Sequence, residues 1–198
     1  MSLDSRVAAL EALLHAVPSN IPPSELTGAL ARVRTALSSL PGSALYRVPP
    51  NYYSLPLRAR ARILCCSPHQ LCKTLVFESP APFAGGLSVV AVVVQYTHRL
   101  DISALQRALG APGLALAADG ARLAGFSHNG VSPFGMAAAV PVVWCKGALA
   151  GGGAVWVGGG EPDVKARVFA GALQKSGAAP AAVLDVSVPR NEEEWEGE

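Results

Sequence analysis

Residues 88–96 read SVVAVVVQY, an almost unbroken run of valine and alanine. Because such a run offers no polar face, it predicts a strand that is buried on both of its faces. Residues 73–77, KTLVF, predict a second strand, and residues 80–86 predict the turn between the two. The apolar stretch 87–94 is interrupted by Ser88 and is far shorter than the ~20 residues of a membrane-spanning helix.

Helices and strands are expected to alternate on either side of this pair. Asp101 is placed to cap a helix over residues 102–109, which Gly110 ends. Further strands are expected at residues 114–117, 140–145, 154–157, 164–168 and 182–186, and further helices at 56–64, 119–124 and 169–176. Because many of the connections are short, the pattern favours a mixed α/β sheet over a regular doubly wound one.

The first 43 residues show a different pattern. Apolar residues repeat at helical spacing over residues 3–17 and again over 26–37, with Ser24 as a candidate N-cap of the second helix. We expect these two helices to form an antiparallel hairpin. The predicted organisation is an N-terminal hairpin appendage over residues 1–43, a main domain over 44–188 and a disordered acidic tail over 189–198.

Composition and charge limit the classes of function. The 198 residues are 51% hydrophobic and 15% charged, which is typical of one globular domain. The net charge is +2, but residues 190–198 hold one arginine and five glutamates, so the remainder of the chain carries +6. A modestly basic body is compatible with an RNA partner, and ordinary solubility charge explains it equally well.

The cysteines do not form a recognisable metal motif. Zinc sites pair two clusters of ligands, whereas only residues 65–72 hold more than one cysteine and Cys145 stands alone. We therefore interpret the four cysteines as reduced thiols that pack as small hydrophobes, with Cys72 not acting as a nucleophile. Asp4 and Glu11 lie where a secretory or transit signal would be basic and apolar, so we expect a cytoplasmic protein.

Two triple-glycine runs, at residues 151–153 and 158–160, suggest nucleotide binding at first sight. Neither forms a phosphate-binding loop of the Walker or Rossmann type, and the acidic residues after Gly160 would repel a phosphate. Glycine also lets a ligand approach the main chain closely. We therefore expect Lys73, the loop 125–135 and the run 158–160 to form one pocket for a small polar group, although Lys73 alone is more simply a solvated edge lysine.

The same residues carry a resemblance to a known family. They occur in the family's order over roughly residues 45–187, and they are CKTLV at 72–76, QY at 95–96, LD at 100–101, Leu105, ALG at 108–110, GF at 125–126, GVSPFG at 130–135, PV at 141–142 and GGG at 158–160. Together they are similar to the YbaK/prolyl-tRNA synthetase-associated editing domain. The resemblance implies a barrel-like mixed β-sheet flanked by helices, and hydrolysis of mischarged aminoacyl-tRNA.

The resemblance also assigns a candidate site. Lys73 matches the family's key lysine, and Pro133 ends a pocket loop whose first position is Asn129, after His128, in place of the family's glycine. We expect Lys73 to bind substrate oxygens, the N–H groups of Asn129, Gly130 and Gly159 to hold the carbonyl oxygen, and His128 to shuttle a proton or only to fix the loop. The residues expected to bind the substrate are Phe126, Ser132, Pro133, Gly158, Gly159 and Gly160.

The partner implied is aminoacyl-tRNA carrying a small amino acid, with a synthetase as a second candidate partner and with no metal, cofactor, membrane or DNA. Arg58, Arg60 and Arg62 are candidates for contacts with tRNA phosphates, and a solvated helix face is the equal alternative. A non-catalytic module that binds tRNA or a synthetase and a hydrolase of small acylated nucleotides or metabolites remain alternatives. Turnover separates the first alternative from the deacylase, and activity without the tRNA body identifies the second.

Overall fold

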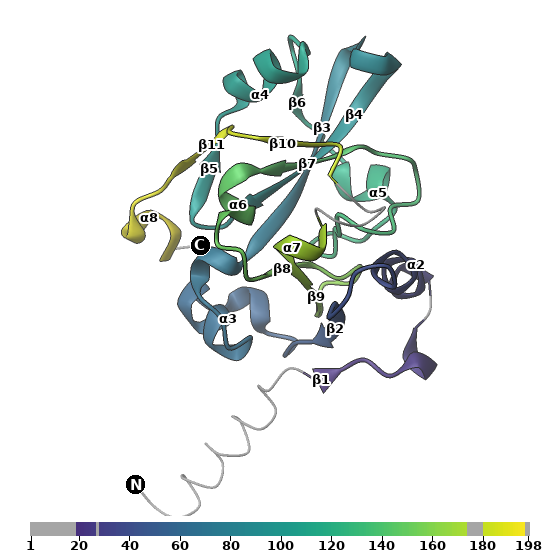
Figure 1. Ribbon diagram of the computed structural model, residues 1–198, viewed down its shortest axis with the longest axis vertical. Coiled ribbons are helices and arrows are strands. Elements are labelled where there is room, and N and C mark those ends of the chain that lie inside the picture. The colour runs from purple at the N-terminus through teal and green to yellow at the C-terminus, as the bar shows by residue number, and fades with distance from the viewer. Residues whose placement is uncertain (1–18, 27, 174–179, 197–198) are drawn as a thin grey trace, which may run out of the picture.

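Three β-sheets organise the chain, which the computed structural model describes over residues 19–26, 28–173 and 180–196 (Figure 1). The five-stranded sheet has the order β10 (Ala182–Leu184), β7 (Val142–Cys145), β4 (Leu87–Gln95), β3 (Cys72–Phe83) and β6 (Ala115–Leu116). The four-stranded sheet has the order β1 (Ser19–Asn20), β2 (Ala44–Arg47), β9 (Val164–Phe169) and β8 (Ala154–Gly158). A third sheet pairs β11 (Ser187–Pro189) with β5 (His98–Leu100).

The mixed α/β class is confirmed, because β4 pairs antiparallel with β3 and parallel with β7. In the described part of the chain the strands lie in three separate sheets and no sheet closes on itself, so the expected barrel-like form is not confirmed. None of the helices in that part is both long and apolar enough to cross a membrane.

Strand β4 is the predicted strand over residues 88–96, and both of its faces are buried. Ala91 and Val93 belong to the apolar cluster between the two large sheets. Val90, Val92 and Val94 belong to a second cluster on the opposite face, which α4 (Ile102–Leu109) covers. The helix begins as predicted, because the Asp101 carboxylate accepts a hydrogen bond from the Ala104 N–H at 2.8 Å.

Strand β3 is longer than predicted. It continues from Cys72 to Phe83, and its pairing with β4 shifts register between Glu78 and Phe83. The turn is confined to the short 3-10 helix η4 (Ala84–Gly86). The expected turn over residues 80–86 was therefore too wide, because two prolines are tolerated where the ladder is already irregular.

The remaining helices are short and connect the sheets. They are α2 (Gly28–Leu37), α3 (Leu57–Ile63), α5 (Gly120–Ala124), α6 (Lys146–Ala150), α7 (Ala170–Leu173) and α8 (Glu192–Glu196), with 3-10 turns η1 (Pro23–Glu25), η2 (Tyr52–Ser54) and η3 (Pro68–Gln70). The sequence did not predict α6 or β11, both of which are too short for a periodic pattern to show.

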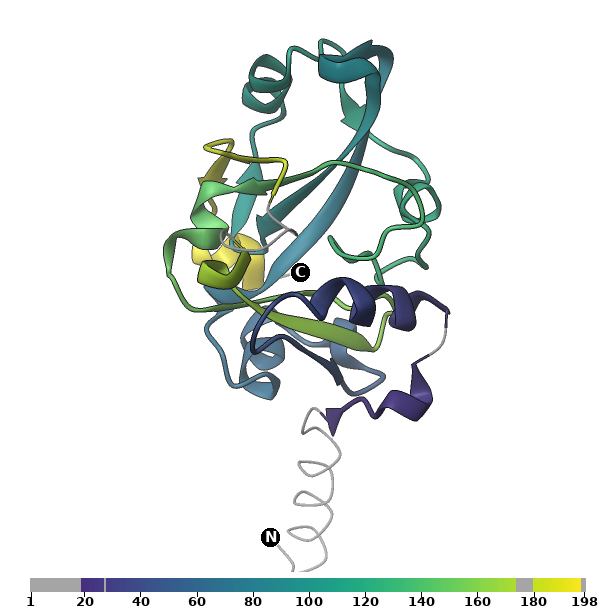
Figure 2. The same cartoon turned by 45° about the vertical axis from the view of Figure 1, so that its right-hand side comes forward.

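The second predicted N-terminal helix is α2, and it packs on the main core. Leu30, Val33 and Leu37 are buried in the same cluster as the residues of β9, and Figure 2 shows α2 lying across the four-stranded sheet. The helix starts at Gly28, so Ser24 does not cap it and lies instead in η1. The first helix of the expected hairpin lies outside the described residues, and the domain boundary after residue 43 stays a prediction.

The expectation of a disordered tail is wrong for residues 192–196, which form α8. Trp195 is buried in an apolar cluster with Leu57 and Leu64, and the Arg58 guanidinium lies 5.6 Å from the centre of its ring. Arg58 also pairs with Glu192. Burial of one large aromatic side chain outweighs the repulsion among neighbouring glutamates that the sequence emphasises.

Candidate functional site

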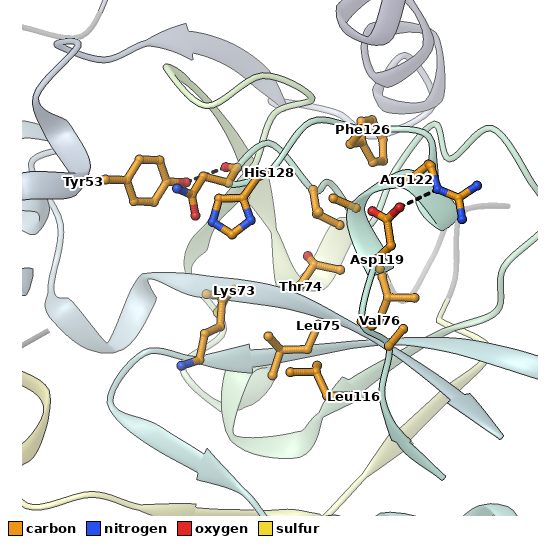
Figure 3. Close-up of a pocket in the computed structure, with 18 of the residues that line it drawn as sticks. Tyr53, Lys73, Thr74, Leu75, Val76, Leu116, Asp119, Arg122, Phe126 and His128 are labelled. Atoms are coloured by element: carbon orange, nitrogen blue, oxygen red, sulfur yellow. Dashed lines mark hydrogen bonds and ion pairs between the residues drawn. The ribbon is translucent and has the colours of Figure 1, made fainter. Parts of the chain in front are cut away.

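A hollow of about 530 Å³ opens between β3, α5 and the loop that follows α5 (Figure 3). Its volume falls within the range of small-ligand sites. Val76, Leu116 and Phe126 give it an apolar wall. The polar residues that matter for its chemistry are Tyr53, Lys73, Thr74, His128, Asn129 and Lys165.

The two glycine-containing turns converge, and they do so by packing on each other. The Gly160 N–H donates to the carbonyl oxygen of Gly130 at 3.0 Å. A Cβ atom added at Gly158 would lie 2.0 Å from the carbonyl oxygen of Val131, a distance that real Cβ atoms do not reach. Glycine is therefore needed there for contact between two main chains, and the expected ligand access to bare backbone is not the primary reason for it.

Most of the expected backbone donors are already occupied. The Gly130 N–H donates to the Ser127 carbonyl oxygen and the Gly159 N–H donates to the Val164 carbonyl oxygen, both at 3.0 Å. In this conformation neither group is available to hold a substrate carbonyl, which corrects two of the three expected donors. The Asn129 N–H is the candidate that remains.

The expected substrate-binding residues divide into two groups. Phe126 and Gly158 line the hollow. Ser132, Pro133, Gly159 and Gly160 do not line it. Ser132 is fully buried, and its hydroxyl accepts a hydrogen bond from the Phe134 N–H at 3.2 Å, so it stabilises the loop from behind.

Asn129 keeps the backbone conformation that a glycine would take. Its φ is 64°, in the left-handed region, and the hydrogen bond from the Gly130 N–H to the Ser127 carbonyl closes the turn around His128 and Asn129. Asparagine tolerates this region better than most residues, because its short polar side chain can hydrogen-bond locally. Asparagine at this position is therefore compatible with the backbone conformation of the turn.

Lys73 lies at the hollow, but its ammonium group does not face the turns. Alternation along β3 places Lys73 and Leu75 on one face and Thr74 on the other. Figure 3 shows the ammonium group pointing away from His128 and Tyr53, and Nζ lies 5.4 Å from the centre of the Tyr96 ring. The expected contact between Lys73 and a substrate held by the two turns is therefore not present in this arrangement.

Lys73 also borders a second hollow of about 480 Å³, which shares Leu75 and Leu116 with the first. His98 and Arg99 line this second hollow as well. The lysine thus stands in the wall between two depressions, and the second depression is also lined by Arg190 and Glu194.

Thr74 is a polar residue of the hollow that the sequence analysis missed. Its side chain points to the side of β3 on which His128 and Phe126 lie (Figure 3). The hydroxyl group is buried and has no hydrogen-bond partner among the described residues. Because a buried unpaired hydroxyl costs free energy, a ligand that fills the hollow is a natural partner for it.

Lys165 is the second residue that was missed, and it is 4% exposed. Its Nζ donates to the Tyr53 hydroxyl at 2.5 Å, and the Tyr53 hydroxyl donates to the carbonyl oxygen of Asn129 at 2.7 Å. Burial, with a smaller contribution from the positive charge of Arg60, lowers the pKa of Lys165 from 10.5 to about 7. Lys165 alternates with Arg167 along β9, as on a solvated strand face, so the sequence holds no signal of its burial.

The three arginines of α3 do not form one surface for phosphates. Arg60 is 5% exposed, its Nε donates to the Leu55 carbonyl oxygen at 2.6 Å, and its guanidinium lies over the rings of Tyr53 and Tyr96. The expectation for Arg60 is therefore wrong, because the aromatic residues before and after α3 enclose it. Arg58 packs on α8, and Arg62 is exposed.

The cysteines lie apart from any ligand set. In the part of the chain that the structure describes, no group of three histidine, cysteine or acidic side chains is arranged to hold a metal ion. Burial raises the pKa of the Cys72 thiol well above its usual range, and it raises that of Cys145 to about 11. A protonated thiol is a poor nucleophile, so Cys72 is a packing residue at the base of the hollow.

Comparison with known proteins identifies relatives of this arrangement. A family model described as the aminoacyl-tRNA editing domain matches residues 57–175. A solved structure of a protein proposed to be a trans-editing enzyme for prolyl tRNA synthetase is 25% identical, with a TM-score of 0.67, and the alignment covers 83% of this chain and 99% of that one.

Two further solved structures share the fold. A scaffold protein used for computational grafting of linear epitopes is 24% identical, with a TM-score of 0.66 over 83% of this chain and 100% of that one. A protein described only as hypothetical is 25% identical, with a TM-score of 0.56 over 67% of this chain and 84% of that one. No curated protein matches the chain.

Proposed function

Because the chain belongs to the aminoacyl-tRNA editing domain family, we propose that it hydrolyses the ester of tRNA mischarged with a small amino acid. The observation that carries the proposal is the hollow in which Thr74, His128 and the Asn129 turn meet. The likeness of the chain to a protein proposed to be a trans-editing enzyme for prolyl tRNA synthetase supports a trans-editing role. We expect it to meet its substrate in the cytoplasm, beside the synthetase that makes the error.

Hydrolysis of the aminoacyl ester requires the protein mainly to position the substrate and the attacking water. An aminoacyl ester is already activated, and the neighbouring hydroxyl of the terminal ribose is able to orient the attacking water. In the proposed complex the Asn129 N–H donates to the ester carbonyl oxygen and the Thr74 hydroxyl pairs with a polar atom of the substrate. In this proposal His128, which lines the hollow, transfers a proton between water and the leaving oxygen.

Selection by size follows from the apolar wall. Val76, Leu116 and Phe126 line the hollow, and we assign them to contact with the amino-acid side chain. A pocket of this kind admits small side chains and excludes larger ones by steric clash. A synthetase has difficulty rejecting the small amino acids, so an editing pocket of this shape complements it.

Lys73 takes a different role from the one expected from the sequence. Its ammonium group points away from the turns, and Lys73 also lines the second hollow together with Arg99, Arg190 and Glu194, so we assign it to a phosphate of the RNA end rather than to the ester. Contacts with phosphates strengthen binding and depend on salt, while they add little to the chemical step.

The test is a deacylation panel of tRNAs charged with small amino acids, with wild type, Thr74→Val, Lys73→Ala and the control Lys146→Ala. Lys146 is exposed on α6 and pairs only loosely with Asp185 at 3.9 Å. Thr74→Val should lower kcat by about tenfold, in keeping with the loss of one hydrogen bond at the reacting end. Lys73→Ala should raise KM and weaken the salt dependence, with kcat little changed.

Equal rates for wild type and Lys73→Ala at all salt concentrations would remove any role of that lysine. Equal rates for wild type and Thr74→Val would remove the hydroxyl from the site. A panel in which no aminoacyl-tRNA is discharged would reject the hydrolytic function itself.

A non-catalytic module that binds tRNA or a synthetase is the second candidate. It is favoured by one observation, the occupation of the Gly130 and Gly159 N–H groups by main-chain acceptors. Such a module would shift charged tRNA in a gel without discharging it, whereas the deacylase would release the amino acid under the same conditions.

A further inference from the structure

We propose that Lys165 is a positioning residue of the hollow, which acts through the Tyr53 hydroxyl to hold the carbonyl oxygen of Asn129 and so fixes the turn that carries His128. The effect on catalysis rests on the proposed deacylation, while the effect on the turn does not.

Lys165 is a buried amine for which the described residues supply no negative partner. Tyr52 and Tyr53 of η2 face it, with ring centres 5.2 and 4.4 Å from Nζ, and Arg60 of α3 is the charged group that acts on it. On the two strands beside β9, its neighbours in register are Tyr46 and Gly158. Burial holds the pKa of both facing tyrosines above the usual range, so they stay neutral and do not balance the charge.

An arrangement of this kind is expensive for a chain that needs only to fold. Taking an ammonium group out of water without a counter-ion costs several kcal/mol, and the cation–π contacts with two tyrosines recover only part of that cost. A methionine of similar length would fill the same space at lower cost. Such perturbed groups concentrate at functional sites, and this one lies in the wall of the hollow.

The proton on Lys165 sets the direction of the hydrogen bonds that follow. A charged ammonium group only donates, so the Tyr53 oxygen accepts from it and the phenolic O–H donates to the Asn129 carbonyl, beside a further side-chain hydrogen bond between Tyr53 and Tyr96. A neutral amine has a lone pair and is a better acceptor for a phenol than a carbonyl oxygen is. Loss of that proton therefore turns the Tyr53 O–H towards Nζ and leaves the Asn129 carbonyl without its donor.

The turn depends on this donor more than an ordinary turn would. Asn129 adopts a positive φ, which costs free energy for any residue other than glycine, so a contact from outside the turn stabilises it. The Tyr53 hydroxyl is that contact, and it comes from a segment 76 residues away in the sequence. Lys165 and Tyr53 together thus restrict the position of His128 and of the Asn129 N–H at the edge of the hollow.

The experiment uses the full chain and four variants. Lys165→Arg keeps a positive charge that does not titrate, Lys165→Met keeps the stem without the charge, and Tyr53→Phe removes the hydroxyl between the two ends. Lys146→Met is the matched control on the surface. Two quantities are followed from about pH 6 to 9, namely the NMR shifts of the Lys165 side chain and the Asn129 amide, and kcat and KM for the aminoacyl-tRNA that wild type discharges.

In wild type we expect the Lys165 and Asn129 signals to change together with a midpoint near 7, and kcat to fall severalfold as the pH rises through it. Lys165→Arg should lose both transitions and keep the kcat of the low-pH form. Tyr53→Phe should show about tenfold lower kcat at every pH with little change in KM, and Lys146→Met should match wild type. Lys165→Met should lose the pH transition in kcat, because a thioether competes far less than a neutral amine for the Tyr53 O–H.

A Lys165 midpoint near 10, or an Asn129 amide that does not follow Lys165, would overturn the proposal even if the arginine variant failed to fold. A kcat profile of Lys165→Met equal to that of wild type would overturn it as well. Coupled NMR transitions in a protein that discharges no aminoacyl-tRNA would instead leave the positioning contact established and reject the proposed function.

Discussion

Alanine at Gly158 tests whether the second triple glycine serves the packing of one main chain on another. The added Cβ atom would lie 2.0 Å from the Val131 carbonyl oxygen, and real Cβ contacts begin at 3.0 Å, so the two segments must separate by at least 3.0 − 2.0 = 1.0 Å. No rotamer relieves this contact, because the clashing oxygen belongs to the backbone and Cβ is fixed to it.

The cost follows from what that movement disrupts. Separation breaks the hydrogen bond from the Gly160 N–H to the Gly130 carbonyl, which is worth about 1 kcal/mol, and overpacking of a tight contact adds about 1–3 kcal/mol. The free energy of unfolding should therefore fall by about 2–4 kcal/mol. At roughly 2–4 °C per kcal/mol for a chain of this size, Tm should fall by roughly 5–15 °C.

Two other glycines supply the controls, with urea titration and thermal unfolding as the assays. Gly151 has no atom within 4 Å of an added Cβ and a φ of −76°, so Gly151→Ala should be neutral or stabilise by up to about 1 kcal/mol. Gly152 has equal space but a φ of 62°, so Gly152→Ala should cost about 1 kcal/mol from backbone strain alone. If Gly158→Ala has the same urea midpoint and Tm as Gly151→Ala but no longer binds substrate, the packing explanation is refuted and ligand access is the correct interpretation.

Three other positions carry predictions for stability. Asn129→Ala should cost about 1 kcal/mol more than Asn129→Gly, because only the second accepts a φ of 64° without strain; equal urea midpoints would contradict this. Trp195→Ala should cost about 3 kcal/mol in thermal unfolding relative to Glu193→Ala, and an unchanged Tm would mean that α8 does not pack. For Lys165, the unfolded chain binds one more proton between about pH 7 and 10, so wild type gains stability as pH rises through that window. At about pH 6 the free energy of unfolding of Lys165→Met should exceed that of wild type by a few kcal/mol. Urea titrations at about pH 10 should show a smaller difference between the two proteins.

The parts of the fold that the sequence predicted are those with a local cause. Residues 88–96 predict β4 because no other conformation buries an apolar run of that length so completely. Asp101 and Gly110 predict the ends of α4 because a side-chain acceptor and a left-handed residue act within one turn of helix. The packing partner of α2 was not predicted, because an apolar helix face indicates that the helix packs on something but does not identify the strand.

The site shows the opposite balance, since its decisive contacts join segments far apart in the chain. The pattern of β9 alternates apolar residues with Lys165 and Arg167, which is typical of a strand with one solvated face. That face is covered by Tyr52 and Tyr53, more than a hundred residues earlier, so Lys165 is buried. No periodicity within β9 contains this information.

The glycines were predicted to matter for a reason that holds in general but not at most of these positions. A residue without a side chain permits close approach of any main chain, whether it belongs to a ligand or to the protein itself. At Gly158 the approaching chain is the loop after Phe126, and at Gly160 it is α2, whose Val33 and Ala29 lie nearest an added Cβ. A ligand-binding role requires free main-chain N–H donors as well as the space left by the missing side chains. The sequence indicates the space but not whether the donors are free.

The alternation of β3 decides which chemistry the hollow can perform. Cys72 and Thr74 face the hollow and the core beneath it, so a residue between them must face the other way, and that residue is Lys73. A one-residue slip of β3 against β4 would bring the ammonium group to the turns, but it would also exchange Val76 and Phe77, which are buried in two different apolar clusters on opposite faces. The register is therefore held by the apolar residues, and the polar group that β3 supplies to the hollow is a hydroxyl. The cation nearest the turns is Lys165, which reaches them from the four-stranded sheet through Tyr53.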